Sequence, residues 1–475
     1  MKPPFDPSLR SRSRHGRVAP VPALLWAAAI VLALGSAGCA SGGPGAAQRP
    51  TEGELPVRWQ LDAPPAAGEA AEVVWDRALR ALQQQALQSN RDLAQAALRW
   101  QRARSQQQQG DLRWQPSLSL GPSASRALDS GTPTSAWQRS ASASLSVGYE
   151  LDLWGRLAQG NTALQAQTGS ARADIEAARV LILSQVAERY WTVAALRTQQ
   201  PWAAEQAALS EEALQITMVR VREGKLLPIE VDKAGATLLD ARLRVSNLAA
   251  DLQLERRQLA LLLARTDGTV AELDAAQLPP QAPPDWALPA PAQALAQRPD
   301  VQRARLGVDA ALARLSVAEA ERYPRLSLSA SVATGSSGWR DWLNQPLMSL
   351  AANLTVPLVD WQRLDLQRDD ARTDLELAAL DLRSTLHKSL VEVESQVIER
   401  QRLAQQQAAA AARLRDATQA EALARLRLEV GSIGRIDWVQ ARSARLAAEQ
   451  DLTQLQLSRW LNHAGLYKVL GQTLP

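Results

Sequence analysis

The sequence predicts a mainly helical protein that carries four amphipathic β-strands and is built from a duplicated unit. Three observations support this fold class. Apolar and polar residues alternate in short stretches, each alternating pair of stretches is followed by a long run rich in Ala, Gln, Leu and Arg, and the whole pattern recurs further along the chain. Aromatic residues make up only 4% of the chain, which favours close-packed helices over a β-rich globule.

The alternation is clearest at residues 140–156, which read SASASLSVGYELDLWGR. From Ala141 to Leu151 every second residue is apolar, and Ser, Gly or Glu stands between. Because side chains of a strand point alternately to opposite faces, this segment is a strand with one apolar and one polar face. After Gly155 the pattern becomes helical, so a strand leads directly into a long helix.

Charge is almost balanced once the first residues are set aside. The chain has 475 residues and a formal net charge of +4. Residues 1–38 hold five basic side chains and one acidic one, so residues 39–475 keep 48 of the 53 basic and 48 of the 49 acidic residues. A neutral chain without a basic stripe gives no sign of nucleic-acid binding.

Residues 1–38 are expected to be a signal peptide, because a basic start is followed by the apolar run Ala23–Leu34 and then by small residues. The run is too short for a transmembrane helix. Ser36-Ala37-Gly38-Cys39 resembles a bacterial lipobox, although Ser36 replaces the usual Leu. The resemblance implies that Cys39, the single cysteine, is acylated and anchors the chain in the outer membrane, with residues 39–71 as a tether. The alternative is an ordinary secretory signal whose cysteine is incidental.

Further along, the chain is expected to form helices, a strand hairpin and a long helical hairpin. Helical patterning runs from Glu72 to about Leu112, and the helix from Arg156 is expected to be interrupted or kinked at Pro201. The returning helix carries an apolar residue at every seventh position, which is typical of a coiled-coil seam. These residues are Val231, Leu238, Val245, Leu252 and Leu259.

An internal repeat gives the domain organisation. Trp114-Gln-Pro-Ser-Leu-Ser-Leu matches Arg322-Tyr-Pro-Arg-Leu-Ser-Leu at a displacement of 208 residues, and Gly224 matches Gly431 at 207. The chain is therefore predicted to be a duplicated unit. The expected segments are a first repeat (72–265, with strand hairpin 114–150 and helical hairpin 155–265), an equatorial linker (266–297) and a second repeat (298–475, with helix 299–322, strand hairpin 323–358 and helical hairpin 361–463).

The four expected strands have the length that a tilted strand needs to cross a bilayer. A sheet in lipid must close, and the smallest barrels have about eight strands, so several chains are expected to share one barrel. Aromatic residues gather at the strand ends, as an interfacial girdle requires, although they could instead cap a soluble sheet. The strands are Pro116–Arg126, Gln138–Glu150, Pro324–Thr334 and Leu347–Pro357, and the aromatic residues are Trp114, Trp137, Tyr149, Trp154, Tyr323, Trp339, Trp342 and Trp361.

Together these features resemble the TolC-like outer-membrane efflux proteins, in particular the OprM/NodT lipoprotein branch. The matching residues are Cys39, Tyr149–Arg156, Arg298–Asp300, Tyr323-Pro324, Val356–Asp360 and Val430-Gly431. The resemblance implies a homotrimer with a twelve-stranded barrel, a periplasmic tunnel of coiled-coil helices, and an equatorial belt from residues 42–89, 266–297 and 463–475. It also implies an exit duct that receives substrates from an inner-membrane pump of the resistance-nodulation-division type through a periplasmic adaptor protein.

The resemblance carries over to individual positions. The strand-to-helix corners are Gly155, Arg156, Asp360 and Arg363, and Gln362 departs from the usual glycine of the second corner. The adaptor-docking tips are Gly224, Val430 and Gly431, and Glu223 departs from the usual Val of the first tip. The candidates for the pore constriction are Asp437, Gln440 and Glu230. Asp437 could equally support the N-terminus of a helix, where a carboxylate is favourable.

Other functions fit less well. The three histidines His15, His387 and His463 are scattered without a cluster of metal-ligand spacing, and no phosphate loop or nucleophile motif is present, so neither an enzyme nor a cofactor is expected. A type I secretion conduit remains an alternative within the channel class. A lipid-anchored periplasmic coiled-coil scaffold or adaptor would explain the helices but not the four strands.

Overall fold

The computed structural model describes residues 56, 59, 76–129, 136–283, 288–336 and 346–472, all of which belong to one compact unit, Arg49–Pro475. The expected signal peptide, the acylated Cys39, nearly all of the tether, and the aromatic residues Trp339 and Trp342 lie outside the described residues.

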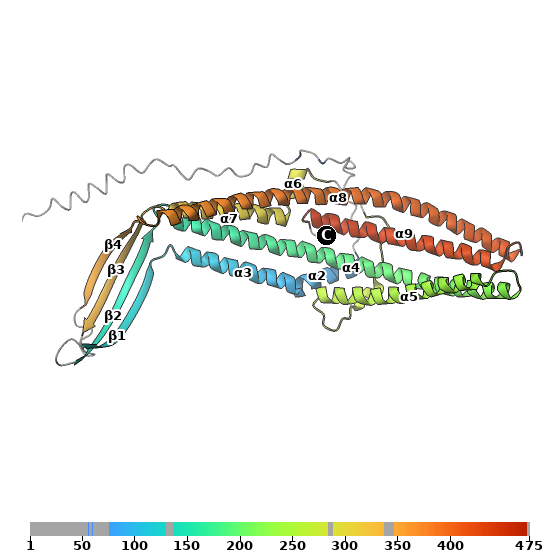
Figure 1. Cartoon of the computed structure of the whole chain (residues 1–475), viewed down its shortest axis with the longest axis horizontal. Helices are drawn as coiled ribbons and strands as arrows, with labels where there is room; N and C mark the ends of the chain where they lie inside the picture. Colours follow the sequence, from blue (N-terminus) through green and yellow to red (C-terminus); the bar gives the residue numbers. More distant parts are fainter. Residues whose placement is uncertain are drawn as a thin grey trace, which may run out of the picture. The chain divides into compact units, whose positions relative to one another are not determined.

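The described part consists of two similar series of helices and strands (Figure 1). The first series comprises α2 (Arg77–Ser89), α3 (Arg91–Leu112), β1 (Ser117–Asp129), β2 (Ala136–Leu151), α4 (Arg156–Arg222) and α5 (Ile229–Leu262). A 3-10 turn, η2 (Ala271–Ala275), and the short α6 (Pro291–Ala296) follow. The second series comprises α7 (Pro299–Ala320), β3 (Arg325–Ser336), β4 (Leu347–Thr355), α8 (Trp361–Glu429) and α9 (Arg435–Val469).

Polar residues set the first helix boundaries. The side chain of Asn90 accepts hydrogen bonds from the amides of Asp92 and Leu93, at 2.8 and 3.2 Å, and so caps the start of α3. The Asn90 side-chain amide also donates to the carbonyl oxygen of Leu262 at the end of α5, 3.0 Å away. Asn90 therefore ends α2 through its backbone amide, which donates to the carbonyl oxygen of Ala86, and through its side chain begins α3 and attaches it to α5.

The helix α4 is continuous across Pro201, so a new helix does not begin there, and the restart that was one of the two expected effects of this proline is wrong. A proline removes one backbone hydrogen bond, which here would have joined its nitrogen to the carbonyl of Arg197. Tight packing on both sides holds the helix together in spite of this loss, because Ala195 and Ala203 are buried. The Arg197 side chain also donates to the carbonyl oxygen of Leu273 in η2.

The strands form one antiparallel sheet in the order β1-β2-β3-β4, in agreement with the four alternating segments of the sequence. The central pair joins the two series, because Val147 of β2 stands opposite Ala330 of β3. β1 and β4 are the edges of this sheet. The sheet lies beyond the ends of the long helices and forms a single layer (Figure 1).

The helices pack around α4, which contacts α2, α3, α5, α7 and α9. The residues of the predicted seam on α5 are buried or half-buried, as expected of the side that faces α4. Small residues let α4 and α7 approach closely. A Cβ atom at Gly169 would come within 3.1 Å of the side chain of Leu306, so a larger residue there would have to displace that side chain. None of the helices in the described ranges combines the length and apolar character needed to cross a lipid bilayer.

The largest core cluster lies where α2, α4, α5 and α9 meet. Its aromatic rings form a ladder, with ring centroids 5.0 Å apart for Trp191 and Trp460, 5.6 Å for Trp460 and His463, and 5.1 Å for His463 and Tyr467. His463 is only 1% exposed. Burial, assisted by the charge of Arg400, lowers the pKa of His463 from 6.5 to about 3, so the imidazole is neutral in the folded protein.

A second buried group ties the beginning of the second series to the end of the chain. The Arg298 guanidinium lies 2.7 Å from carboxylate oxygens of both Asp300 and Glu392 and donates to the carbonyl oxygen of Val469 at 2.7 Å. Burial alone would raise the pKa of Asp300, but the hydrogen bonds and charge of Arg298 outweigh it and hold this pKa below its usual value. Arg298 thus links α7, α8 and α9.

His463 makes stability depend on pH in a defined window. Between pH 6.5 and about 3 the unfolded chain binds a proton at this residue that the folded chain does not. We therefore expect the free energy of unfolding to fall as pH drops below 6.5, by up to about 1.4 kcal/mol per pH unit from this group.

The change His463→Leu should flatten the fall in the thermal midpoint between pH 6.5 and 4. The exposed His387 supplies the matched control, since His387→Gln should leave the wild-type profile unchanged. The measurement is the thermal midpoint of the detergent-solubilised protein, followed by circular dichroism. Parallel profiles for His463→Leu and the wild type would contradict this account.

Candidate functional site

Three surfaces lie where the sequence predicts functional residues: the sheet, the strand-to-helix corners and the helix tips. The register of the sheet separates its residues by face. Leu145 of β2 stands opposite Leu120 and Val332, whereas Ser146 stands opposite Ser119 and Ser331. One face is therefore apolar and the other carries small polar residues.

The apolar face is exposed in the single chain. Leu120 is 71% exposed, Met348 80% and Leu350 85%. Contiguous apolar surface of this kind marks contact with a membrane or with another protein. Every residue of β4 is exposed, so the edge of the sheet is open as well.

The opposite face, here called the serine face, is covered largely by hydroxyls. Its members are Ser117, Ser119, Ser123 and Ser125 of β1, Ser140, Ser142, Ser144 and Ser146 of β2, Ser327, Ser329 and Ser331 of β3, and Ser349 of β4. Pairs of these hydroxyls join neighbouring strands. The Oγ atoms of Ser119 and Ser146 are 2.6 Å apart, and those of Ser123 and Ser142 are 2.7 Å apart.

Aromatic side chains mark both ends of the sheet. At the helical end the rings of Trp154 and Tyr323 stack with centroids 4.7 Å apart, and the Trp154 indole donates to the carbonyl oxygen of Pro324 at 2.8 Å. At the other end the Arg126 guanidinium lies 4.5 Å from the Trp137 ring centroid. Amphipathic rings at both ends of an apolar face are typical of a membrane-water interface.

The first strand-to-helix corner is shaped by a glycine and an aspartate. Gly155 has φ +74°, a left-handed conformation that an L-residue adopts only at a cost. The Asp152 carboxylate accepts hydrogen bonds from the amides of Leu157 and Ala158, at 3.1 and 2.9 Å, and so caps α4. Arg156 forms a 2.8 Å ion pair with Glu150, which fixes the helix to the end of β2.

The second corner differs, as the departure at Gln362 indicates. Gln362 occupies the position that corresponds to Gly155, but it lies inside α8, which begins at Trp361. Asp360 precedes that helix, and its carboxylate forms a 3.1 Å ion pair with Arg363. The second helix thus begins two residues earlier in its repeat than the first, and no left-handed residue is needed.

The two helix tips share one backbone turn. Gly224 and Gly431 have φ +70° and +75°. In the first turn the amide of Lys225 donates to the carbonyl oxygen of Arg220 at 2.9 Å. In the second turn the amide of Ser432 donates to the carbonyl oxygen of Arg427, also at 2.9 Å. This is the Schellman arrangement, which ends a helix with a left-handed glycine.

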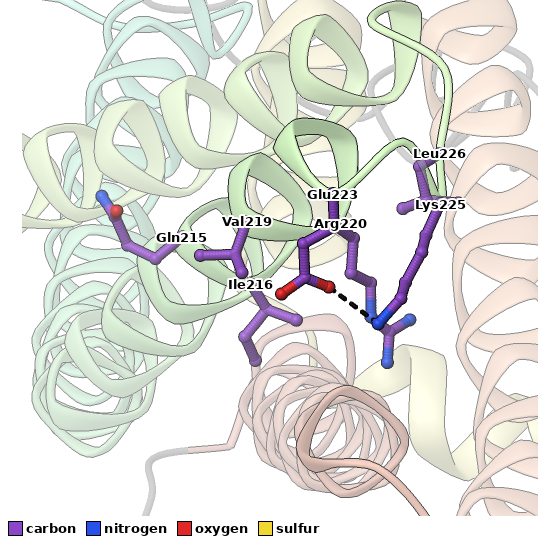
Figure 2. A pocket seen from close by; sticks show the side chains of 7 residues that line it. All are labelled: Gln215, Ile216, Val219, Arg220, Glu223, Lys225 and Leu226. Carbon is purple, nitrogen blue, oxygen red and sulfur yellow. Dashed lines mark ion pairs between the residues drawn. The ribbon is translucent and has the colours of Figure 1, made fainter.

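The side chains of the tips are chemically different. In the first tip Glu223 and Lys225 form a 2.8 Å ion pair, and hydrogen bonding to Lys225 lowers the pKa of Glu223 (Figure 2). This pair lies at the rim of a 630 Å³ hollow with Ile216, Val219 and Leu226 in its wall. In the second tip Val430 replaces the charged residue and is 78% exposed.

Ion pairs fasten the two helical hairpins to each other near the tips. Arg435 at the start of α9 pairs with Glu212 of α4. Further from the tip, Arg442 of α9 lies 2.7 Å from Glu205 of α4 and 3.4 Å from Glu421 of α8. Sequence motifs do not reveal these residues. Glu421 is a carboxylate at a buried position of α8. A buried charge requires a partner, so this burial is the signal that could have indicated its ion pair.

The structure places the three constriction candidates at the starts of α5 and α9. Asp437 is exposed, and its carboxylate accepts a 2.9 Å hydrogen bond from the amide of Gly434, which supports the N-terminus of α9. Gln440 is exposed one turn further on. Glu230 pairs with Lys233 at 2.7 Å. Within the described ranges, no group of three His, Cys, Asp or Glu side chains is placed to hold a metal ion.

Comparison with known proteins identifies the class. The sequence profile of the family described as outer membrane efflux protein matches residues 82–265 and 290–472. The two matched segments begin 208 residues apart and end 207 apart, which is the displacement of the internal repeat. The chain belongs to the outer membrane efflux protein family.

Individual relatives agree with this family. The pyoverdine export outer membrane protein OpmQ of Pseudomonas aeruginosa is 30% identical over 412 residues, which is 83% of this chain and 85% of the relative. The probable efflux pump outer membrane protein TtgC of Pseudomonas putida is 29% identical over 435 residues, 85% of each chain. The cation efflux system protein CusC of Escherichia coli K12 is 25% identical over 403 residues, 83% of this chain and 87% of the relative.

Solved structures show the same fold. A CusC crystal structure has a TM-score of 0.77 at 24% identity and covers 90% of this chain and 98% of its own. The open state of the MtrE outer membrane channel of Neisseria gonorrhoeae has a TM-score of 0.70 at 23% identity and covers 88% and 98%. The predicted TolC-like fold and the predicted efflux role in the outer membrane are thus confirmed, and the family is one of transport proteins, not of enzymes.

The tip turn gives a prediction about stability. Gly431→Ala should lower the free energy of unfolding by about 1 to 2 kcal/mol, because alanine is strained in the left-handed region. Gly235 lies inside α5 with open space around the position that a methyl group would take. Because glycine is less favourable than alanine inside a helix, Gly235→Ala should raise the free energy of unfolding by about 0.5 to 1 kcal/mol. Thermal midpoints of the two variants, compared with the wild type, check the opposite signs. Equal midpoints for Gly431→Ala and the wild type would show that the turn is not constrained.

Proposed function

We propose that three copies of this chain assemble into the exit duct of a tripartite efflux system, with a shared twelve-stranded barrel in the outer membrane and a tunnel of helices in the periplasm. The open four-stranded sheet is the observation that carries the proposal. Its apolar face is suited to lipid, but the unpaired backbone groups of β1 and β4 cannot remain unpaired there. Pairing β4 of one copy with β1 of the next removes every edge.

The helices support the same arrangement. Among the described helices, α5 lies beside α4, and α8 lies beside α7, α9 and the short α6, so much of the outer side of each long hairpin is left uncovered by these helices. Large apolar residues are exposed along both helices, among them Leu239 (61%), Leu243 (60%), Leu377 (58%) and Val391 (59%). Neighbouring copies would cover these residues at the level of the helices as they complete the sheet at the level of the strands.

The tips suit contact with a periplasmic adaptor protein that connects the duct to an inner-membrane pump, proposed to be of the resistance-nodulation-division type. Gly224 and Gly431 fix two exposed turns, and Val430 offers an apolar contact. The named relatives act in pyoverdine export, in efflux and in cation efflux. For this chain we propose efflux of substrates selected by the pump, with acylated Cys39 as an additional attachment to outer-membrane lipid.

The assembly can be tested with a matched pair of variants. Purified in detergent, the wild type should have the mass of a trimer and should conduct ions in a planar bilayer. Leu350→Arg places a charge on the lipid face, at a cost of about 2 to 4 kcal/mol per copy near the bilayer centre, and should abolish the trimer. Ser349→Arg, on the neighbouring position of the serine face, should preserve it.

Two results would contradict the proposed assembly. One is a wild-type protein that remains a monomer in solution without detergent. The other is a Leu350→Arg variant that assembles and conducts as well as Ser349→Arg.

Asp437 is proposed to line the constriction of the closed duct, in addition to its contact with Gly434. Rings of carboxylates favour cations in a pore. Asp437→Asn should therefore raise the anion permeability relative to the cation permeability. Asp232→Asn removes an exposed carboxylate at the start of α5 and should leave the permeability ratio unchanged. Reversal potentials in a salt gradient measure the ratio. If Asp437→Asn changes only the thermal midpoint, the residue supports its helix and does not line the pore.

A further inference from the structure

The serine face contains one complete row of serines across the sheet. Ser119 of β1 stands opposite Ser146 of β2, which stands opposite Ser331 of β3, which in turn stands opposite Ser349 of β4. The Oγ atoms of the two outer pairs are in contact, at 2.6 Å for Ser119 and Ser146 and 2.7 Å for Ser331 and Ser349. All four strands therefore present a hydroxyl at the same level.

The levels on either side of this row carry only small or uncharged residues. Gly121, Ser144, Ala333 and Leu347 are aligned on one side, where Leu347 is the one large apolar residue, and Ser117, Gly148, Ser329 and Ala351 are aligned on the other. The serine face has no ionisable residue within 117–125, 140–148, 327–335 and 347–353, all of which the structure describes.

In the described strands, the charged positions of this face lie only at its two ends: Asp129, the last residue of β1, stands at the end away from the helices, and Glu150 and Arg325 stand at the helical end, where they are paired. Glu150 forms its ion pair with Arg156, and Arg325 lies 3.6 Å from Glu321. Paired charges create a weaker field than isolated ones. The middle of the serine face is thus electrically neutral over its whole width.

Neutral hydroxyls differ physically from the charged rings that select ions. A ring of carboxylates or guanidinium groups concentrates ions of opposite sign and excludes ions of the same sign. Serine carries no charge, is short, and here satisfies part of its hydrogen bonding with the serine of the next strand. A wall of such residues leaves the space in front of it wide and does not discriminate by charge.

We propose that the serine face forms a neutral, hydroxyl-lined segment of the barrel lumen that passes cationic and anionic substrates equally. The inference rests on the proposed trimeric barrel, in which the apolar face contacts lipid and the serine face lines the lumen. It deepens that function by defining the substrate class for this segment: molecules of either sign of charge. Selection by charge then belongs to other parts of the transport path.

Cysteine labelling tests this directly on the full chain reconstituted in liposomes. Ser331→Cys and Ser146→Cys are each exposed to a cationic and an anionic methanethiosulfonate reagent, and each labelling rate is divided by the rate of the same reagent with free 2-mercaptoethanol. The wild type, whose single cysteine is Cys39, gives the background. The two normalised rates should agree within about threefold at both positions, because a neutral wall does not concentrate either ion.

Two further variants make the outcomes distinguishable. Val332→Cys, next to Ser331 but on the apolar face, should react with neither reagent. Ser349→Asp combined with Ser331→Cys places a charge in the same row and should favour the cationic reagent by about tenfold or more.

Suppose that the normalised rates of the cationic and anionic reagents differ by more than about tenfold at Ser331→Cys alone. This result would overturn the proposal of a neutral wall, since a ratio of that size is what a charged site produces, but it would not contradict the barrel. If adding Ser349→Asp to Ser331→Cys leaves the ratio of the two labelling rates unchanged, residues 331 and 349 do not line the same lumen. That result would also overturn the inference. If Val332→Cys reacts as fast as Ser331→Cys, the two faces are not separated by lipid, and the proposed barrel itself fails.

Discussion

The unpaired edges of a four-stranded sheet are the constraint on which this molecule depends. A sheet with an apolar face, exposed Leu120 and Leu350 and open β1 and β4 is not stable by itself in lipid or in water. The described helices are compatible with supplying the missing partners from further copies. The long hairpins expose apolar residues along α5 and α8, and in the proposed trimer the association that pairs the strand edges also covers these residues.

Within one chain, α4 and the buried polar groups keep the two repeats in a fixed relation. α4 belongs to the first repeat, yet it packs on α7 and α9 of the second. Arg298 and Asn90 each connect elements that are distant in the sequence, the first to the end of α9 and the second to the end of α5. The ion pairs of Arg435 and Arg442 do the same near the tips. These contacts within one chain therefore hold the helices of the two repeats in place before any second copy binds.

Local patterns are sufficient to predict the elements, and insufficient to predict their contacts. Alternation locates the strands, and Gly224 and Gly431 locate the turns, because each feature reflects backbone geometry within a few residues. The departure at Gln362 likewise indicates a changed corner. The expected interruption of the helix at Pro201 is wrong because the loss of one hydrogen bond is local, whereas the packing that compensates it comes from other helices. The partners of Arg298, Arg442 and Glu421 depend on which helices meet, which no short segment of this sequence specifies.

The two tips also bear on how such proteins diverge. Their turn is fixed by one glycine and by hydrogen bonds between backbone groups, so the neighbouring side chains contribute little to its geometry. The same backbone turn carries Glu223 with Lys225 in the first tip and Val430 in the second. Residues at these positions can be exchanged at small energetic cost to the fold. The tips are therefore places where recognition of other proteins can evolve independently of the scaffold that carries them.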